Sequence, residues 1–272
     1  MRSIFEFAAM VKHRQLAAPV QEDLLPVLED LAGRLLDRLD DTNRRFSNAL
    51  DFGGRGAVAP ALAARGMAVT SADFAPRMAA HAGGTAFTLR GPDDFGLPAA
   101  AYDLVIASLA LHFLDDLPGA LIQLKRALKP GGLFLASMPV LGTLQELRIA
   151  LLDTEEALTG RVSPRVSPFP ELRDCAGLLQ RAGFLLPVAD VEEIAVLYAN
   201  PLALLHELRA AGETNALTER SRTIPPRALF PAALAALPQQ EGRSKVTLRL
   251  AVLTGWAPDV AGADMATATP LS

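Results

Sequence analysis

The spacing of apolar residues changes several times along the chain, and each change predicts a new element. Within residues 24–39 they recur every three or four positions with charges between them, which predicts an amphipathic helix. The stretches FSNALDF (46–52) and MAVTSADF (67–74) predict two short strands. Between them, residues 57–65 predict a helix that ends at Gly66.

A second unit of the same kind follows. The apolar run at residues 100–113 is typical of a buried parallel strand, and the stretch LPGALIQLKRAL (117–128) predicts the next helix. The turn KPGG then separates this helix from an apolar strand that reaches Met138. Alternating strands and helices predict an α/β fold, with a mostly parallel sheet covered by helices on both faces and right-handed crossovers.

The second half of the chain is less regular. It predicts helices near 143–158, 171–182 and 201–211, and strands near 184–188, 193–198 and 246–256. We expect these strands to form an antiparallel edge hairpin on the same sheet. The expected organisation is a helical segment 1–45, a core 46–140, a segment 141–257 that completes the same domain, and a flexible tail 258–272.

Composition narrows the possible functions. The net charge is −4 and no dense Lys/Arg cluster is present, which disfavours a nucleic-acid partner. Cys175 is the only cysteine, so a disulfide within the chain and a cysteine-cluster metal site are excluded; we expect it to be a small buried helix residue. No apolar run approaches the roughly 18 residues of a membrane helix, and the N-terminus lacks a secretory signal pattern. We expect no integral membrane segment and a cytoplasmic location.

Candidate binding residues follow the first predicted strand. Asp51 precedes Gly53, Gly54 and Gly56, in a turn whose backbone N–H groups would face the carboxyl edge of the sheet. Asp73 ends the second strand, where it could accept hydrogen bonds from two ribose hydroxyls. Together these residues predict a nucleoside site, although glycines also end strands and Asp73 could be a solvated turn residue.

Four further residues complete the expected cofactor-binding set: Phe74, Asp93, Asp94 and Ser108. Asp93 and Asp94 lie in RGPDDFGLP, where a turn or a helix cap is the simpler explanation. The loop itself spells D-F-G-G-R-G, which departs from the dinucleotide fingerprint G-x-G-x-x-G and weakens the case for NAD.

These motifs resemble those of the class I S-adenosylmethionine (SAM) methyltransferases. That family has D-x-G-x-G-x-G at the first turn, an acid ending the next strand, which Asp73 matches, and an acid before a Leu-Pro pair, which Asp93 matches best. The resemblance spans residues 48–138 and implies a Rossmann-like fold with a seven-stranded sheet and SAM as cofactor. This loop is one residue shorter: Gly53 matches the first glycine, Gly56 the last, and Gly54 is ambiguous.

A narrower resemblance covers residues 46–256. The stretches GTLQELRIAL, SPRVSPFPELRDCAGLLQRAGF and HELRAAGETNAL look like the arginine-hydroxylase family of respiratory complex I assembly factors and its α-proteobacterial members. The resemblance implies a protein substrate such as a complex I subunit, and an arginine target, in a bacterial cytoplasm or at the periphery of the inner membrane. Phe113 stands where that group usually has tryptophan. The malonyl-carrier-protein methyltransferase of biotin synthesis is a more distant resemblance.

His112 is the candidate general base or substrate contact, because it follows the fourth strand at the expected reaction edge. A histidine packed beside Phe113 is the structural alternative. Glu146 and Arg148 could meet a polar substrate group or form a solvated helix face. The four histidines are scattered, so no metal site is expected. Three functions stay open: a protein-modifying SAM enzyme that hydroxylates or methylates, a small-molecule or acyl-carrier methyltransferase, and a non-catalytic assembly scaffold. Oligomeric state is not predicted.

Overall fold

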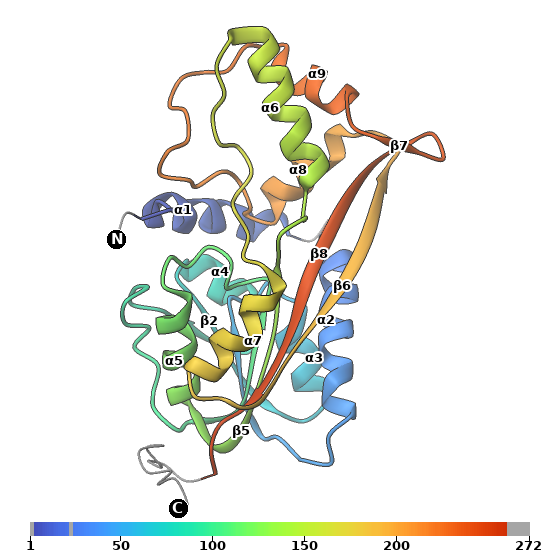
Figure 1. The fold of residues 1–272 in the computed structure, drawn as a ribbon. Coiled ribbons are helices and arrows are strands. Elements are labelled where there is room, and N and C mark those ends of the chain that lie inside the picture. The colour runs from blue at the N-terminus through green and yellow to red at the C-terminus, as the bar shows by residue number, and fades with distance from the viewer. Residues whose placement is uncertain (1–2, 22–23, 260–272) are drawn as a thin grey trace, which may run out of the picture.

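A mixed sheet forms the centre of the protein in the computed structural model, which describes residues 3–21 and 24–259 (Figure 1). Most of the predicted tail, residues 260–272, lies outside the described residues. The strands are β1 Asn48–Phe52, β2 Ala68–Asp73, β3 Thr85–Thr88, β4 Tyr102–Ser108, β5 Leu128–Pro139, β6 Leu185–Tyr198, β7 Gln239–Gln240 and β8 Arg243–Trp256. Their order is β3-β2-β1-β4-β5-β8-β6, and the short β7 pairs with β8 off this path. The predicted α/β class and sheet are confirmed.

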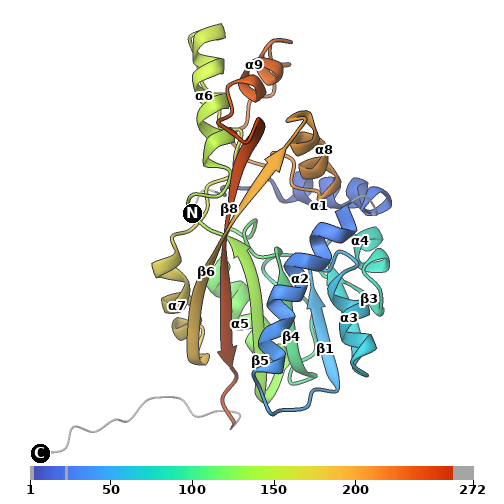
Figure 2. The ribbon, with the colours of Figure 1, turned by 90° about the vertical axis from the view of Figure 1, so that its right-hand side faces the viewer.

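Helices cover both faces of this sheet (Figure 2). They are α1 Phe7–Ala17, the 3-10 helix η1 Ala18–Val20, α2 Leu25–Asp40, α3 Val58–Ala64, α4 Pro76–His81, α5 Leu117–Ala127, α6 Gln145–Thr159, α7 Leu172–Arg181, α8 Leu202–Ala210 and α9 Leu229–Ala235. The apolar stripe predicted at 24–39 packs with α3 against one face, while α5 and α7 pack against the other. Cys175 is buried on α7, as expected.

The order of the strands creates a crevice beside β1. From β1 the chain builds β2 and β3 on one side, and it then crosses to β4 and β5 on the other, all in parallel. Ligands of open α/β sheets bind where the order reverses in this way, at the carboxyl ends of the strands. The loops after β1 and β4 meet at this point.

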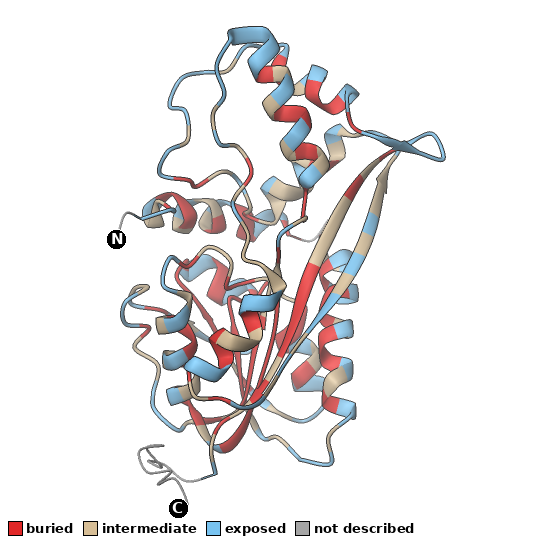
Figure 3. Ribbon diagram, viewed as in Figure 1, coloured by how far each residue is buried: buried red, intermediate tan, exposed pale blue. Residues whose placement is uncertain are grey.

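The last two long strands extend beyond the core. β8 pairs antiparallel with β5 and with β6, which confirms the predicted edge hairpin. Their upper halves carry a separate apolar cluster built with α6, α8 and α9, whereas the continuously buried sheet lies below (Figure 3). The prediction of two strands, 184–188 and 193–198, was wrong: β6 is one 14-residue strand. No residue of this edge strand is fully buried, so the charges of Asp190, Glu192 and Glu193 do not interrupt it.

The sequence patterns did not separately predict α1, η1, α4, β3, α9 and β7; all of these except α1 are short. None of the helices in the described ranges is long and apolar enough to cross a bilayer. The division into segments at residues 45 and 140 stays a prediction.

Candidate functional site

Two aspartates lie at the carboxyl ends of the central strands. Asp51 is in β1 and Asp73 ends β2, with exposed fractions of 0% and 1%. Neither carboxylate oxygen of Asp51 has a hydrogen-bond partner among the described residues. Burial raises the pKa of Asp51 to about 7, an effect that Asp73 reinforces and that the backbone of Ala59 and nearby arginines oppose.

Asp73 is fully engaged by the protein itself. Its Oδ1 accepts the N–H of Ala75 at 2.7 Å. Its Oδ2 accepts Nε and Nη2 of Arg14 at 2.9 and 2.5 Å. The same guanidinium donates to the carbonyl oxygen of Gly53 at 3.0 Å. A single arginine therefore joins the acid at the end of β2 to the glycine turn after β1.

The buried position of Arg14 follows from helix α1. Met10, Arg14 and Ala17 are buried at the four- and three-residue spacing of one helix face, so the arginine stands in an otherwise apolar stripe. Phe7, on the same helix, packs edge-on against Phe74 with 5.1 Å between ring centroids. Helix α1 thus covers both Asp73 and its neighbour.

The glycine turn is tightly packed by the chain's own atoms. Gly53 has φ +70°, and a Cβ there would lie 2.3 Å from the Cβ of Ala110. A Cβ on Gly54 would lie 2.2 Å from Oδ2 of Asp51. Gly56, with φ +87°, requires the left-handed backbone region. The ambiguous Gly54 therefore serves to admit the carboxylate of Asp51.

A second cluster of charged side chains lies beside the cluster of Asp51, Asp73 and Arg14. Arg55, in the glycine turn and 5% exposed, pairs with Oε1 of Glu213 and donates to the carbonyl oxygen of Leu109 at 3.0 Å. Oε2 of Glu213 lies 2.8 Å from Nε2 of His112. Burial alone would raise the pKa of Glu213, but His112 and Arg55 outweigh this effect and hold that pKa well below its usual range. Glu213 is therefore a carboxylate at neutral pH.

His112 is held on one side only. Its side chain is 5% exposed, and Nδ1 has no hydrogen-bond partner among the described residues. The rings of Phe113 and Phe169 lie 5.2 and 6.1 Å from the imidazole, centroid to centroid. The guanidinium carbon of Arg14 lies 5.5 Å from the centroid of the Phe113 ring. Phe113 therefore contacts both Arg14, which binds Asp73, and His112, which binds Glu213.

The segment after α8 ties this group to α1. The N–H of Glu6 donates to the carbonyl oxygen of Ala216 at 2.7 Å, and the N–H of Thr218 donates to that of Ile4 at 2.9 Å. The Cβ position of Gly212 lies 3.3 Å from the Cα of Arg14. Helix α1 and residues 211–218 therefore form one cap, called here the N-terminal cap.

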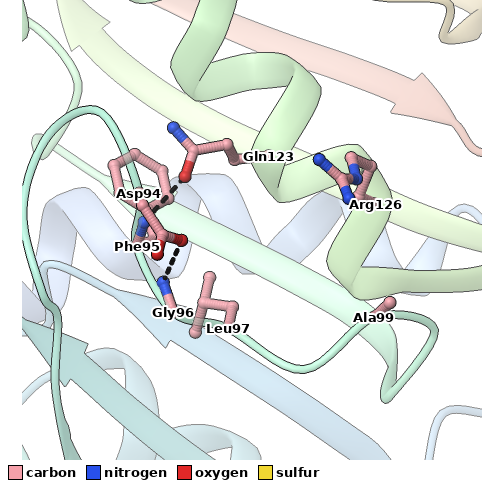
Figure 4. Close-up of a pocket in the computed structure, with 7 residues that line it drawn as sticks. All are labelled: Asp94, Phe95, Gly96, Leu97, Ala99, Gln123 and Arg126. Atoms are coloured by element: carbon pink, nitrogen blue, oxygen red, sulfur yellow. Dashed lines mark hydrogen bonds between the residues drawn. The ribbon is translucent and has the colours of Figure 1, made fainter.

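The remaining expected residues lie around this centre. Asp93 and Asp94 are exposed. The carboxylate of Asp94 accepts the N–H of Gly96 at 2.9 Å (Figure 4) and also pairs with Arg90. They do not contact the buried acids, although Phe95 beside them packs 5.8 Å from Phe74, centroid to centroid. As cofactor contacts they stay predictions.

Ser108 ends β4, and its Oγ lies 3.5 Å from Oγ of Ser137. Glu146 and Arg148 do not join the site. Glu146 accepts the N–H of Thr247 at 3.1 Å, and Arg148 donates to the carbonyl oxygen of Val166 at 3.0 Å. Both therefore hold segments of the second half together.

The site is closed in this conformation. A cavity of about 10 Å³ lies at the glycine turn and is lined by Leu28, Gly54, Arg55, Ala57, Val58 and Ser108. A second, of about 90 Å³, lies at Asp94 on the loop before β4. Cofactor pockets usually measure roughly 300–1,000 Å³. The carboxylates and the turn suit a nucleoside with an amino-acid group, and in this conformation Arg14 occupies Oδ2 of Asp73.

The comparisons with known proteins give the family. The model described as "Methyltransferase domain" matches residues 23–186. The chain belongs to the methyltransferase family. It is 32% identical over 270 residues to the arginine-hydroxylase NDUFAF5, mitochondrial, of Rattus norvegicus, covering 93% of this chain and 77% of the relative. The human protein of that name is 32% identical over 237 residues, covering 84% and 69%. Both expected resemblances are confirmed.

Other relatives widen the range of activities. Malonyl-[acyl-carrier protein] O-methyltransferase of Halorhodospira halophila is 32% identical over 217 residues, covering 76% of this chain and 72% of the relative. Among solved structures, a protein of Bacillus halodurans C-125 superposes with a TM-score of 0.55 at 14% identity, covering 83% of this chain and 99% of the other. At this identity the structural likeness supports the fold alone.

Three residues of the site were not predicted as site residues: Arg14, Arg55 and Glu213. Arg14 had one detectable signal, a charge within the apolar face of a helix. Glu213 lies in the stretch GETNAL, which carries part of the narrower resemblance. Arg55 lies inside the glycine turn, where its side chain gives no local signal. Among the described residues, no group of three or more His, Cys, Asp or Glu could hold a metal ion.

Proposed function

We propose that this protein is a SAM-dependent enzyme that modifies an arginine side chain of a respiratory complex I subunit. The observation that carries the proposal is the part of the chain in which Glu213 lies. This residue completes the charged group at the strand ends, yet it comes from the segment after β8's partner strand β6, within the region of the narrower resemblance. Glu213 lies outside residues 23–186, which match the methyltransferase domain, whereas the similarity to the arginine-hydroxylase relative of Rattus norvegicus covers 93% of this chain.

The proposed cofactor residues are those of the two strand ends. Asp73 would hold the ribose hydroxyls, and Asp51 with the turn at Gly53 and Gly54 would face the amino-acid end. When bound, SAM supplies an electrophilic methyl group on a positively charged sulfur. The chain would first have to release Asp73 from Arg14, because the guanidinium occupies Oδ2 of the carboxylate that would hold the ribose. The N-terminal cap is the element that would move.

The test compares peptide masses of complex I subunits from three strains. One lacks this protein, one carries the wild type, and one carries Asp73→Ala. We expect one arginine to lack the mass of an oxygen, for hydroxylation, or of a methylene group, for methylation, in the first and third strains only. Unchanged masses in the deletion strain would contradict a role in modifying these subunits.

A non-catalytic assembly scaffold is the second candidate, because Arg14 already pairs with the carboxylate of Asp73, which a cofactor would need. On that account the Arg14–Asp73 pair is a permanent structural contact. Complex I would then assemble normally with a folded variant that binds no SAM, and fail only when the protein is absent. If Asp73→Ala abolishes both modification and assembly while folding normally, the scaffold account is wrong.

A further inference from the structure

Glu213 and His112 form a hydrogen-bonded pair with a defined direction. Glu213 pairs with Arg55, whose charge favours the carboxylate form, so the bond of 2.8 Å between Oε2 of Glu213 and the imidazole places a hydrogen on Nε2. In a neutral imidazole the other nitrogen, Nδ1, then carries a lone pair and no hydrogen. The carboxylate thereby selects one tautomer.

Nδ1 has no partner among the described residues, although the side chain is only 5% exposed. A buried polar atom without a partner costs roughly 1–3 kcal/mol, so buried nitrogens are usually bonded. Protonation of Nδ1 in the free protein would place an N–H in the same position without an acceptor. A substrate group with a hydrogen to donate would satisfy this atom.

The location of the pair fits this role. His112 follows β4 at the carboxyl edge of the sheet, beside the glycine turn that contains Arg55. Glu213 is about a quarter exposed, so the pair lies at the border between the buried acids and solvent. Arg55 contacts the second oxygen of the same carboxylate and fixes its orientation.

We propose that Glu213 is a positioning residue that holds His112 as the proton acceptor of the reaction, with Nδ1 as the accepting atom. The step applies to methylation: the N–H bond of the substrate nitrogen would break, its electron pair would form the bond to the transferred methyl group, and the proton would form a new bond to Nδ1. The resulting imidazolium is stabilised by Glu213. The inference rests on the proposed function and adds a substrate class: the modified atom carries a hydrogen, unlike a free carboxylate.

The first test determines the tautomer of His112 by two-bond ¹H–¹⁵N correlation spectra of the full chain near neutral pH. The chain has four histidines, so His112 can be assigned from the signals that disappear in His112→Gln. We expect the Nε2–H tautomer in the wild type. In Glu213→Gln, the amide oxygen should pair with Arg55 and the NH₂ group should donate to Nε2, which moves the hydrogen to Nδ1.

Glu207→Gln is the matched control, because Glu207 accepts a hydrogen bond from Tyr198 at 2.6 Å and does not contact His112. It should leave the spectrum of His112 unchanged. An Nδ1–H or averaged tautomer in the wild type would overturn the proposal, and this result needs no variant to fold. The same tautomer in wild type and Glu213→Gln would also overturn it.

The second test measures the rate at which the complex I arginine becomes modified in strains in which expression of each variant is switched on. Glu213→Gln should lower the rate of modification at least tenfold, in line with the roughly 10²–10⁴-fold contribution of acid–base groups, while SAM affinity stays within about threefold. Glu207→Gln should modify normally. Modification by Glu213→Gln at the wild-type rate would overturn the role of Glu213. If the wild type itself does not bind SAM or does not modify the arginine, the proposed function is contradicted, whereas the tautomer result still stands.

Discussion

Replacing Arg14 by methionine should tighten SAM binding and destabilise the free protein. Methionine keeps the length and apolar contacts of the side chain on α1 but removes every donor. Asp73 would lose both bonds to its Oδ2, from Nε at 2.9 Å and Nη2 at 2.5 Å, while keeping the N–H of Ala75. The ribose hydroxyls would then meet a carboxylate that no longer has to exchange partners.

The magnitude follows from the bonds that must be exchanged. A hydrogen bond to a charged group contributes about 1.5–3 kcal/mol. The ribose hydroxyls would replace part of what Arg14 donates to Asp73, so exchanging Arg14 for ribose costs a net free energy of roughly 2 kcal/mol. The apparent affinity of the wild type for SAM is reduced in proportion to the fraction of molecules in which Asp73 is free of Arg14. A cost of roughly 2 kcal/mol corresponds to about 30-fold in Kd, which Arg14→Met should recover. Removing one partner of a buried ion pair costs about 3–5 kcal/mol of stability. The Tm of the free variant should therefore fall by many degrees.

Calorimetric titration with SAM and thermal melting measure both effects. Arg34→Met is the control, since Arg34 pairs with Asp30 on the exposed side of α2 and has no contact with the site. It should change neither Kd nor Tm appreciably. Weaker SAM binding by Arg14→Met, with a folded protein, would refute the exchange and indicate that Arg14 contacts the cofactor itself.

Three other perturbations have defined outcomes. Burial raises the folded-state pKa of Asp51 to about 7 from 3.8, so the stability that its protonated form contributes is present at low pH and lost as pH rises toward 7. Chemical denaturation should show that the free energy of unfolding of the wild type falls by about 3 kcal/mol between pH 5 and pH 8. Asp51→Asn should not show this fall. Gly54→Ala places a Cβ 2.2 Å from that buried carboxylate, and denaturant unfolding should show a loss of about 1–3 kcal/mol. Growth of a deletion strain without biotin should be normal; a biotin requirement would favour the acyl-carrier methyltransferase.

Local patterns were sufficient to predict the core of the fold. The apolar runs that became β1, β2 and β4, and the glycines between β1 and α3, each carry their information within a few residues. Asp51 and Asp73 were predicted at the strand ends because a parallel register places successive carboxyl ends at one edge. The structure places both there, although their role toward a cofactor stays a proposal.

The closed state of the site could not be predicted in this way. Arg14 is 59 residues from Asp73 in sequence, Glu213 is 101 residues from His112, and Arg55 is 158 residues from Glu213. A helix-face arginine can reach solvent along its own stem as easily as it can pair inside. Only the packing of the N-terminal cap on the strand ends determines which of these occurs.

A crystal structure of the protein grown with S-adenosylhomocysteine would test the central claim most directly. The account predicts the ribose hydroxyls on the carboxylate of Asp73, with the guanidinium of Arg14 displaced from Oδ2. Crystals grown at saturating ligand in which Arg14 still binds Asp73 and no ligand occupies the glycine turn would contradict it.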